Sequence, residues 1–370
     1  METTKSADGT VIAYDRTGDG PPLVIALGAF CDRKSFVPPA SLTSQLTVCT
    51  YDRRGRGDSG DTQPYSPDRE VADLAAVIEA VSGSRSGAGA AGSGAAGSGA
   101  GAFVFGHSSG AALALRAAAQ GVPMAALVAY EAPYVMPGTR TLAEDPVGRI
   151  TELVSSGRRS DAVKFWMTDV VQAPAEMIPM MENSPMWAGL EALTHTLPYD
   201  LALAGDQGIP VDYLAKITVP VLVVGGANSP EWFHRTVEAT TEAIPGARLT
   251  MLEGQDHGAP PEVIASVLTG FFLGSLDHAA PGVLGSLRAS RVGVSAVGPY
   301  GGISRRSMIF RDKPDIGWGA EAKRVGDEHC DCRGPGRADR GRSGGWRDRP
   351  AAGREDSRGR GPRFRGAGRN

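Results

Sequence analysis

Apolar residues along the chain fall into short runs, and stretches of helical period separate the later runs. The runs are rich in β-branched and aromatic residues, which is typical of buried strands. Seven such runs occur: Val11–Tyr14, Leu23–Leu27, Thr47–Tyr51, Phe103–Phe105, Ala126–Tyr130, Val221–Val224 and Arg248–Leu252. Helical patterns cover Asp68–Val81, Ser109–Gln120, Glu231–Ile244 and Pro261–Leu273. This alternation predicts an α/β fold with a mostly parallel, doubly wound sheet.

Two segments interrupt the alternation. Residues 86–102 consist only of Gly, Ala and Ser, a composition typical of flexible linkers that bury no core. We interpret them as a low-complexity loop inserted between a helix and a strand. From about residue 134 to residue 200 the sequence is helical in pattern and rich in Met and Trp. We expect this segment to form a small helical lid inserted between two core strands.

The periodicity fades beyond about residue 274, and the charge changes with it. The stretch from Arg333 to Asn370 holds 12 Arg and 4 acidic residues, although the net charge of the whole chain is −3. We therefore predict a folded domain over residues 1–275 and a disordered, Arg/Gly-rich tail over residues 276–370. The tail is compatible with an RNA-binding segment and with a solvated extension that has no partner. We expect no nucleic-acid binding, because the rest of the chain contains no RNA-binding module.

The cysteines and the first residues of the sequence bear on the cellular compartment and on whether a metal site is expected. Four cysteines are too few and too scattered for a disulfide framework. Cys330-Asp331-Cys332 lacks the second ligand pair of a zinc site. The N-terminal stretch has no apolar segment of a secretory signal, and no apolar run approaches the ~18 residues of a membrane helix. We expect a cytoplasmic protein without a metal or a membrane anchor.

The stretch FVFGHSSGAALALRAAAQ, at Phe103–Gln120, contains the candidate nucleophile. Its GHSSG segment, residues 106–110, follows an expected strand and opens an expected helix. This context is what makes the pattern Gly-x-Ser-x-Gly specific. Small neighbours leave room for a strained serine, and the free N–H groups of a helix N-terminus suit an oxyanion. Ser108 is therefore the predicted nucleophile.

Three further motifs accompany this one in a fixed order along the chain. They are VIALGAF at Val24–Phe30, TYDRRGRGDSG at Thr50–Gly60 and GQDH at Gly254–His257. With these motifs the chain resembles the α/β-hydrolase family over about residues 8–274. The second motif supplies the family's Asp-x-Arg-Gly-x-Gly-x-Ser pattern through Asp52, Arg54, Gly55, Gly57 and Ser59. The resemblance implies an α/β-hydrolase fold and hydrolysis through an acyl-enzyme on Ser108.

The resemblance also implies an oxyanion hole made of backbone N–H groups. One expected donor is the N–H of Ser109. In the loop after the first motif, Leu27-Gly28 stands in place of the family's His-Gly. We place the second donor at Ala29, with Phe30 behind it. A backbone donor survives the loss of the histidine, because its N–H does not depend on that side chain.

Six histidines are candidates for the base that takes the serine proton. His257 follows the last expected strand in a loop that contains glycines, as a triad requires, and we select it as the base. His107 is interpreted as a packing or polar-network residue, and His195 and His234 as surface residues. His278 and His329 belong to the weakly structured end of the chain.

The acid of the triad is where the sequence departs from the family pattern. Asn228 and Ser229 stand where the family usually carries Asp. Glu231 suits the first turn of a helix, and the side chain of Asp256 should point away from the base. We predict Glu131, in LVAYEAPY, because some family members place the acid at the end of this strand. A salt bridge or a loop hydrogen bond is its alternative role, and a Ser–His dyad or a non-catalytic binding protein then remains.

The lid is the basis for predicting a substrate. Phe30, Trp166, Met180 and Trp187 are expected to line an apolar pocket for a small ester-like molecule, because Met and aromatic side chains suit such pockets. The alternative is that the lid residues form the lid's own core. No Gly-rich phosphate loop or metal-ligand cluster accompanies the motifs, so we expect no cofactor. The predicted reaction is hydrolysis of an ester, or of a related acyl or carbon–carbon bond.

Overall fold

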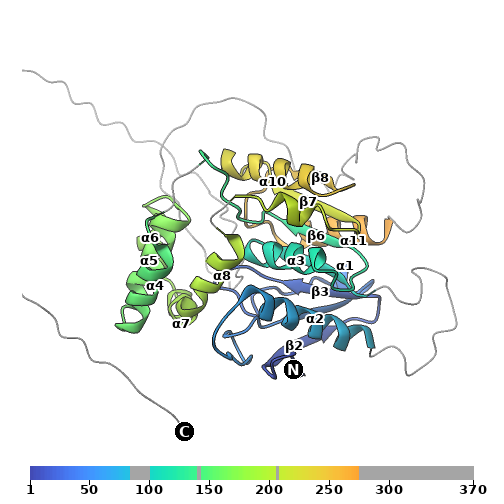
Figure 1. Ribbon diagram of the computed structural model, residues 1–370, viewed down its shortest axis with the longest axis horizontal. Coiled ribbons are helices and arrows are strands. Elements are labelled where there is room, and N and C mark those ends of the chain that lie inside the picture. Colours follow the sequence, from blue (N-terminus) through green and yellow to red (C-terminus); the bar gives the residue numbers. More distant parts are fainter. Residues whose placement is uncertain (84–100, 140–142, 206–207, 275–370) are drawn as a thin grey trace, which may run out of the picture. The chain divides into compact units, whose positions relative to one another are not determined.

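The computed structural model describes residues 1–83, 101–139, 143–205 and 208–274 (Figure 1). Within these residues one sheet has the strand order β1-β2-β4-β3-β5-β6-β7-β8. The strands are β1 (Glu2–Lys5), β2 (Val11–Thr17), β3 (Pro22–Ala26), β4 (Thr47–Tyr51), β5 (Phe103–His107), β6 (Leu127–Tyr130), β7 (Val221–Gly226) and β8 (Arg248–Leu252). β1 and β2 run antiparallel to their neighbours, and the strands from β4 to β8 in the sheet are parallel to one another.

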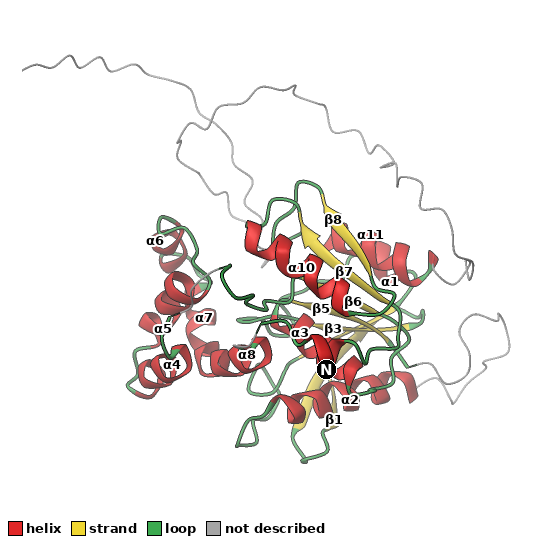
Figure 2. Cartoon of the chain, turned by 45° about the horizontal axis from the view of Figure 1, so that its top comes forward, coloured by secondary structure: helices red, strands yellow, loops and turns green. Residues whose placement is uncertain are grey.

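Helices cover both faces of this sheet (Figures 1 and 2). They are α1 (Ala40–Thr43), α2 (Pro67–Gly83), α3 (Ser109–Ala119), α4 (Pro146–Ser155), α5 (Arg159–Phe165), α6 (Met177–Glu182), α7 (Trp187–Leu193), α8 (Leu197–Ala204), α9 (Val211–Leu214), α10 (Glu231–Ala243) and α11 (Pro261–Phe272), with a π-helical turn at Trp166–Val170 and a 3₁₀ turn at Thr194–Thr196. Side chains of α2, α3, α9 and α10 form the core on one face of the sheet. Those of α1 and α11 form the core on the other face.

The alternation of side chains along β3 explains why both faces are covered. Leu23 and Ile25 join the core under α1 and α11, whereas Val24 and Ala26 join the core under α2 and α3. All four side chains are fully buried. Successive residues of a strand point to opposite faces, so a continuous apolar run requires a cover on each side. The doubly wound arrangement follows from this requirement.

The structure confirms the predicted fold class and all seven predicted strands, with shifts of a few residues at their ends. The strand β1 was not predicted. Its sequence, Glu2–Lys5, has no apolar alternation and stays mostly exposed, and backbone pairing with β2 defines it. The predicted low-complexity loop lies outside the described residues except for Gly101 and Ala102, and the predicted tail from residue 276 lies wholly outside them. No helix in the described ranges is long and apolar enough to cross a membrane.

The predicted helical lid is present between β6 and β7. Its helices α4 to α7 gather to one side of the sheet (Figure 1). They share an apolar core that includes Ile150, Trp166 and Trp187 and also the side chain of Phe30. The last helix of the insertion, α8, returns to the sheet domain and packs against α2 and α3. This helix extends to Ala204, slightly beyond the predicted end of the lid.

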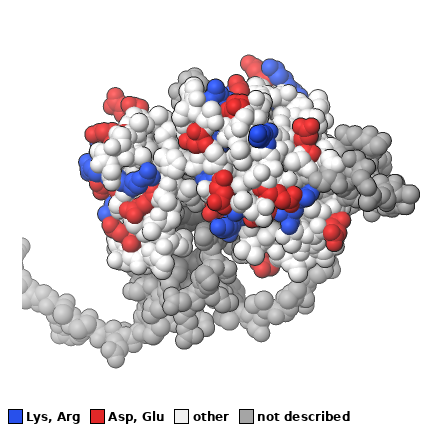
Figure 3. Space-filling model, turned by 90° about the horizontal axis from the view of Figure 1, so that it is seen from below, with Lys and Arg blue, Asp and Glu red and all other residues white. Residues whose placement is uncertain are grey.

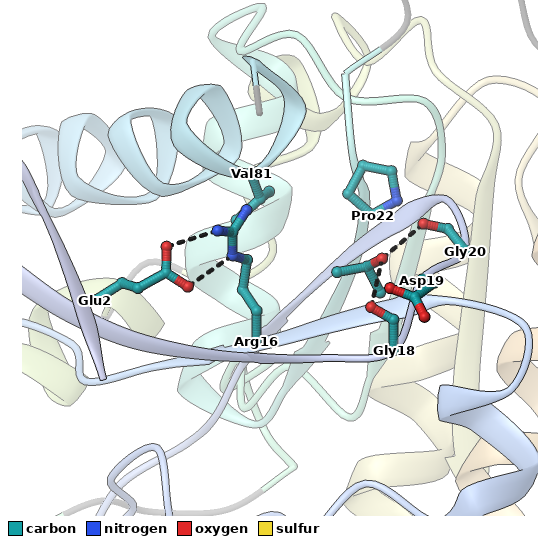
Figure 4. A pocket seen from close by; sticks show the side chains of 8 residues that line it. Glu2, Arg16, Gly18, Asp19, Gly20, Pro22 and Val81 are labelled. Carbon is teal, nitrogen blue, oxygen red and sulfur yellow. Dashed lines mark hydrogen bonds and ion pairs between the residues drawn. The ribbon is translucent and has the colours of Figure 1, made fainter. Parts of the chain in front are cut away.

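Two surface features bear on where a ligand can bind. Acidic and basic side chains are interspersed on the face shown in Figure 3, so this face offers no large field of one sign. A hollow of about 460 Å³ is lined by polar groups that include the Glu2–Arg16 ion pair and the carbonyl of Gly18 (Figure 4). The hollow adjoins Pro22, at the start of β3, and Ser108 follows the end of the parallel strand β5. The hollow therefore lies at the amino ends of the parallel strands, and the serine lies at their carboxyl ends.

A domain boundary near residue 275 can be tested by truncation. A chain ended after residue 275 keeps α11, whose Phe271 and Phe272 are buried. We expect its Tm, measured by circular dichroism, to stay within about 2 °C of the full chain. A chain ended after residue 258 loses α11 and exposes the core under that helix, so it should not fold. A clear fall in Tm or soluble yield of the 1–275 chain would contradict the predicted boundary.

Candidate active site

Three residues that the sequence singled out share an unusual backbone conformation. Phe30, Ser108 and Glu131 have φ angles of 59°, 56° and 48°. They follow the C-terminal ends of β3, β5 and β6, which are neighbours in the sheet. Positive φ is costly for residues other than glycine and concentrates at functional sites. The carboxyl edge of the sheet is also where open α/β folds bind ligands.

Ser108 occupies a tight turn between β5 and α3. Its N–H donates to the carbonyl of Tyr130 at 2.9 Å, so the turn begins while the chain is still attached to β6. A Cβ at Gly110 would lie 2.1 Å from the carbonyl oxygen of Ala26, and a Cβ at Gly28 would lie 2.7 Å from Cβ of Ser108. Glycine is required at Gly110 because the backbone of β3 approaches too closely for any side chain, and at Gly28 because the side chain of Ser108 occupies the space of a Cβ.

The two expected oxyanion donors flank the serine. Ser109 is the first residue of α3, so its N–H has no acceptor within the helix. Ala29 lies in the loop after β3, partly buried against the lid core. The next residue, Phe30, meets Trp166 edge-on, with ring centroids 6.0 Å apart. The loop that carries the expected donor Ala29, here called the oxyanion loop (residues 27–30), is therefore packed against the lid.

The structure brings Glu131 and His257 into direct contact. The Nδ1 atom of His257 donates to Oε2 of Glu131 at 2.6 Å. The Oε1 atom of Glu131 accepts from the N–H of Gly226 at 2.7 Å. Burial acts to raise the pKa of this fully buried carboxyl, but the hydrogen bond and charge of His257 and the Gly226 N–H together lower it. The carboxylate therefore stays ionised beside the histidine.

Neighbouring groups hold His257 from several sides. The ring of Phe233 stacks on the imidazole, with centroids 4.8 Å apart and an interplanar angle of 19°. The Nε2 atom of His107 donates to the carbonyl of His257 at 2.8 Å, and the hydroxyl of Tyr130 donates to the carbonyl of Asp256. Burial, and next the charge of His257, lower the pKa of His107 to about 3. His107 is therefore a neutral residue of the polar network, as the sequence analysis interpreted it.

The usual acid position holds no carboxylate. Asn228 is exposed, and its N–H donates to the carbonyl of Gln255 at 2.8 Å. Ser229 is buried beside it. His195 and His234, expected at the surface, are half-buried. Their Nε2 atoms donate to the carbonyls of Gly55 and of Gly226, the last residue of β7, at 2.8 and 3.0 Å.

The lid residues expected to line a pocket differ in burial and in their neighbours. Trp166 is buried next to Phe30. Trp187 is also buried, and its indole N–H donates to the hydroxyl of Ser160 within the lid at 2.9 Å. Met180 is 38% exposed. Trp166 is therefore adjacent to the loop that carries Ala29 and Phe30, while Trp187 packs inside the lid.

A buried cluster of charged residues lies next to the oxyanion loop, and it was not predicted from the sequence. Arg53 and Arg56 both donate to Oδ1 of Asp200, at 2.9 and 2.7 Å. Arg53 also pairs with Glu70. All four side chains are at most 2% exposed. The sequence signal was the pair of arginines at the unspecified positions of the Asp-x-Arg-Gly-x-Gly motif, whereas nothing near Asp200 marked it.

Within the described ranges, no group of three acidic, histidine or cysteine side chains could hold a metal ion. The residues with reactive groups at this edge of the sheet are Ser108, His257 and Glu131.

The chain matches the alpha/beta hydrolase family over residues 23–267. An alpha/beta hydrolase from Sphaerobacter thermophilus DSM 20745 is 45% identical with a TM-score of 0.66, and the match covers 73% of this chain and 100% of that one. A search of curated proteins found no match.

More distant structures share the fold. The enol-lactonase from Burkholderia xenovorans LB400 is 20% identical with a TM-score of 0.53, and the match covers 75% of this chain and 100% of that one. An esterase from Exiguobacterium antarcticum is 20% identical with a TM-score of 0.52, covering 73% of this chain and 98% of that one. The family match over more than half of the sequence shows that this chain belongs to the alpha/beta hydrolase family.

Proposed function

We propose that the protein is a serine hydrolase that cleaves a small apolar ester, or a related acyl or carbon–carbon bond, through an acyl-enzyme on Ser108. The observation that carries this proposal is the 2.6 Å hydrogen bond between Glu131 and His257. A histidine oriented by a buried carboxylate is the arrangement that activates a serine hydroxyl in a triad. Membership of the family supports hydrolysis in general.

The proposed reaction has two halves. Oγ of Ser108 attacks the substrate carbonyl while Nε2 of His257 takes its proton, and the N–H groups of Ala29 and Ser109 bind the oxyanion. The tetrahedral intermediate then collapses, and His257 protonates the leaving alcohol. A water molecule, deprotonated by His257, attacks the acyl-enzyme and releases the acid and the free serine. Glu131 stabilises the imidazolium in each half.

The electrostatics of the neighbouring histidine support this role for His257. His107 lies against it, with ring centroids 4.6 Å apart. A charged His107 at this distance would oppose protonation of His257 by like-charge repulsion. Because the pKa of His107 is lowered to about 3, it holds the loop as a neutral donor without this repulsion at neutral pH.

Glu131→Gln tests the proposed acid. The substituted amide would donate to Nδ1 of His257 and move the ring proton to Nε2, which then cannot accept the serine proton. We expect kcat on a chromogenic ester to fall by up to ~10⁴, with Ser108→Ala as the inactive control. Asn228→Asp is the reciprocal variant. If Glu131→Gln keeps near-full activity and Asn228→Asp raises activity many-fold, the acid is not Glu131 and the enzyme works as a weak dyad.

The acyl-chain preference tests the proposed pocket. If Phe30 and Trp166 contact the acyl group, kcat/KM should rise from acetate toward medium-length or aromatic acyl groups. Each buried methylene contributes about 0.8 kcal/mol, a few-fold per carbon. Trp166→Leu should move the optimum to longer chains, whereas Met180→Ala, at an exposed position, should leave the profile unchanged. A flat profile in the wild type would contradict an apolar acyl pocket.

The state of His107 predicts a pH dependence of stability. Below about pH 6.5 the unfolded chain binds a proton at this residue that the folded protein does not, so the free energy of unfolding should fall with the pH toward 3. His107→Gln retains an N–H donor and does not titrate. The free energy of unfolding is measured by urea titrations between pH 4 and 7. From pH 7 to pH 4 the variant should lose less of it than the wild type, and the difference should be on the order of 2–3 kcal/mol. Parallel curves would show that His107 titrates alike in both states.

A further inference from the structure

One peptide group joins the oxyanion loop to the buried charged cluster. The N–H of Ala29 belongs to the same peptide plane as the carbonyl of Gly28. This carbonyl accepts from Nη1 of Arg56 at 2.5 Å. The C=O and N–H bonds of a trans peptide point in opposite directions in one plane, so a donor that fixes the carbonyl also fixes the direction of the N–H. The guanidinium further polarises the peptide and strengthens its N–H as a donor.

The second oxyanion donor is attached to the same cluster. The hydroxyl of Ser109 donates to Oδ1 of Asp200 at 2.6 Å and accepts from Nη1 of Arg53 at 2.9 Å. Oδ1 of Asp200 also accepts from Nη2 of Arg56 at 2.7 Å. Oδ1 of Asp200 therefore binds the side chain of Ser109 directly. Through Arg56 it is also linked to the peptide group that carries the N–H of Ala29.

Burial makes this connection strong. Arg56, Asp200 and Ser109 are all at most 2% exposed. Burial alone would raise the pKa of Asp200, but the positive charges of Arg56 and Arg53 lower it, so the carboxylate stays charged. Charge-assisted hydrogen bonds are shorter and stronger than neutral ones and are not screened by solvent here.

We propose that Arg56 and Asp200 are positioning residues that aim the N–H groups of Ala29 and Ser109 at the reacting carbonyl. The proposal rests on the proposed function, since it requires Ser108 to form a tetrahedral intermediate. Neither side chain needs to touch the substrate. Asp200 belongs to α8, the last helix of the lid insertion, so the orientation of the oxyanion hole depends on how this helix docks.

The test compares two buried ion pairs of one protein. Arg56→Lys and Asp200→Asn disturb the proposed pair. Arg54→Lys and Asp73→Asn are matched controls, because Arg54 and Asp73 are fully buried and doubly hydrogen-bonded at 2.6 and 2.7 Å, and touch neither Gly28 nor Ser109. For each variant, four quantities are measured: kcat and KM on a chromogenic ester, the inhibition constant of a trifluoromethyl ketone, the Kd of the acid product and the Tm. The ketone forms a tetrahedral oxyanion on the serine, whereas the acid product does not.

We expect kcat to fall about 10- to 100-fold in Arg56→Lys and Asp200→Asn, since misdirected donors lose transition-state stabilisation. Affinity for the ketone should fall by the same factor, while KM and the Kd of the acid product change little. The control variants should lower the Tm to a similar degree and keep kcat within about threefold of the wild type. A purely structural role predicts equal effects on kcat in both pairs.

An equal loss of kcat in the control variants would overturn the proposal, and so would three further outcomes. If a fluorophosphonate does not label Ser108 in the wild type, the proposed function and this inference both fail. If the wild type is labelled and active but Arg56→Lys and Asp200→Asn keep kcat and ketone affinity, only this inference fails. Where these variants do not fold, Ser109→Ala removes the hydroxyl contact and leaves both charges paired. Unchanged kcat and ketone affinity in Ser109→Ala would likewise overturn it.

Discussion

The hydrogen bond between Glu131 and His257 is the interaction on which the rest of the site depends. A carboxylate with no solvent exposure is stable only when hydrogen bonds compensate for lost hydration. Glu131 obtains this compensation from Gly226, the last residue of β7, and from His257, which follows β8. The ends of three adjacent strands must therefore be in register for the charge to be tolerated. Errors in this register would leave a buried charge unpaired, so the same contact that orients the base also favours the correct arrangement of the sheet.

The positive φ angles at the carboxyl edge are supported by the same close packing. Ser108 and Glu131 adopt conformations that cost free energy, and hydrogen bonds from their N–H groups to Tyr130 and Val224 hold them there. Both bonds continue the parallel ladders of the sheet past the last strand residue. The sheet therefore acts as a rigid base for the turns, and the strained residues lie at its carboxyl edge.

The lid and the sheet domain meet at the oxyanion loop through two different kinds of contact. Phe30 packs into the apolar core of the lid, and Asp200 carries charge from the lid insertion into the cluster of Arg53 and Arg56. Apolar packing tolerates small displacements, whereas buried ion pairs require particular distances and directions. The charged contacts are therefore better suited to hold the peptide groups of the loop in one orientation.

The sequence by itself determined the fold class and the elbow around Ser108, because these follow from strand alternation, helix starts and glycine spacing. The choice of Glu131 and His257 as partners rested on the resemblance to the family, and a Ser–His dyad stayed open as the alternative. The contact between Glu131 and His257 matches that choice, and its catalytic role stays a prediction. Only the tertiary structure decided the rest. In the folded chain, Asp200 pairs with Arg56, which is 144 positions away in the sequence. Met180 is exposed, and Glu2–Lys5 pairs with β2 as an edge strand. These features depend on contacts between distant segments, and a local pattern of polar and apolar residues contains no information about which distant side chain will neutralise a buried charge.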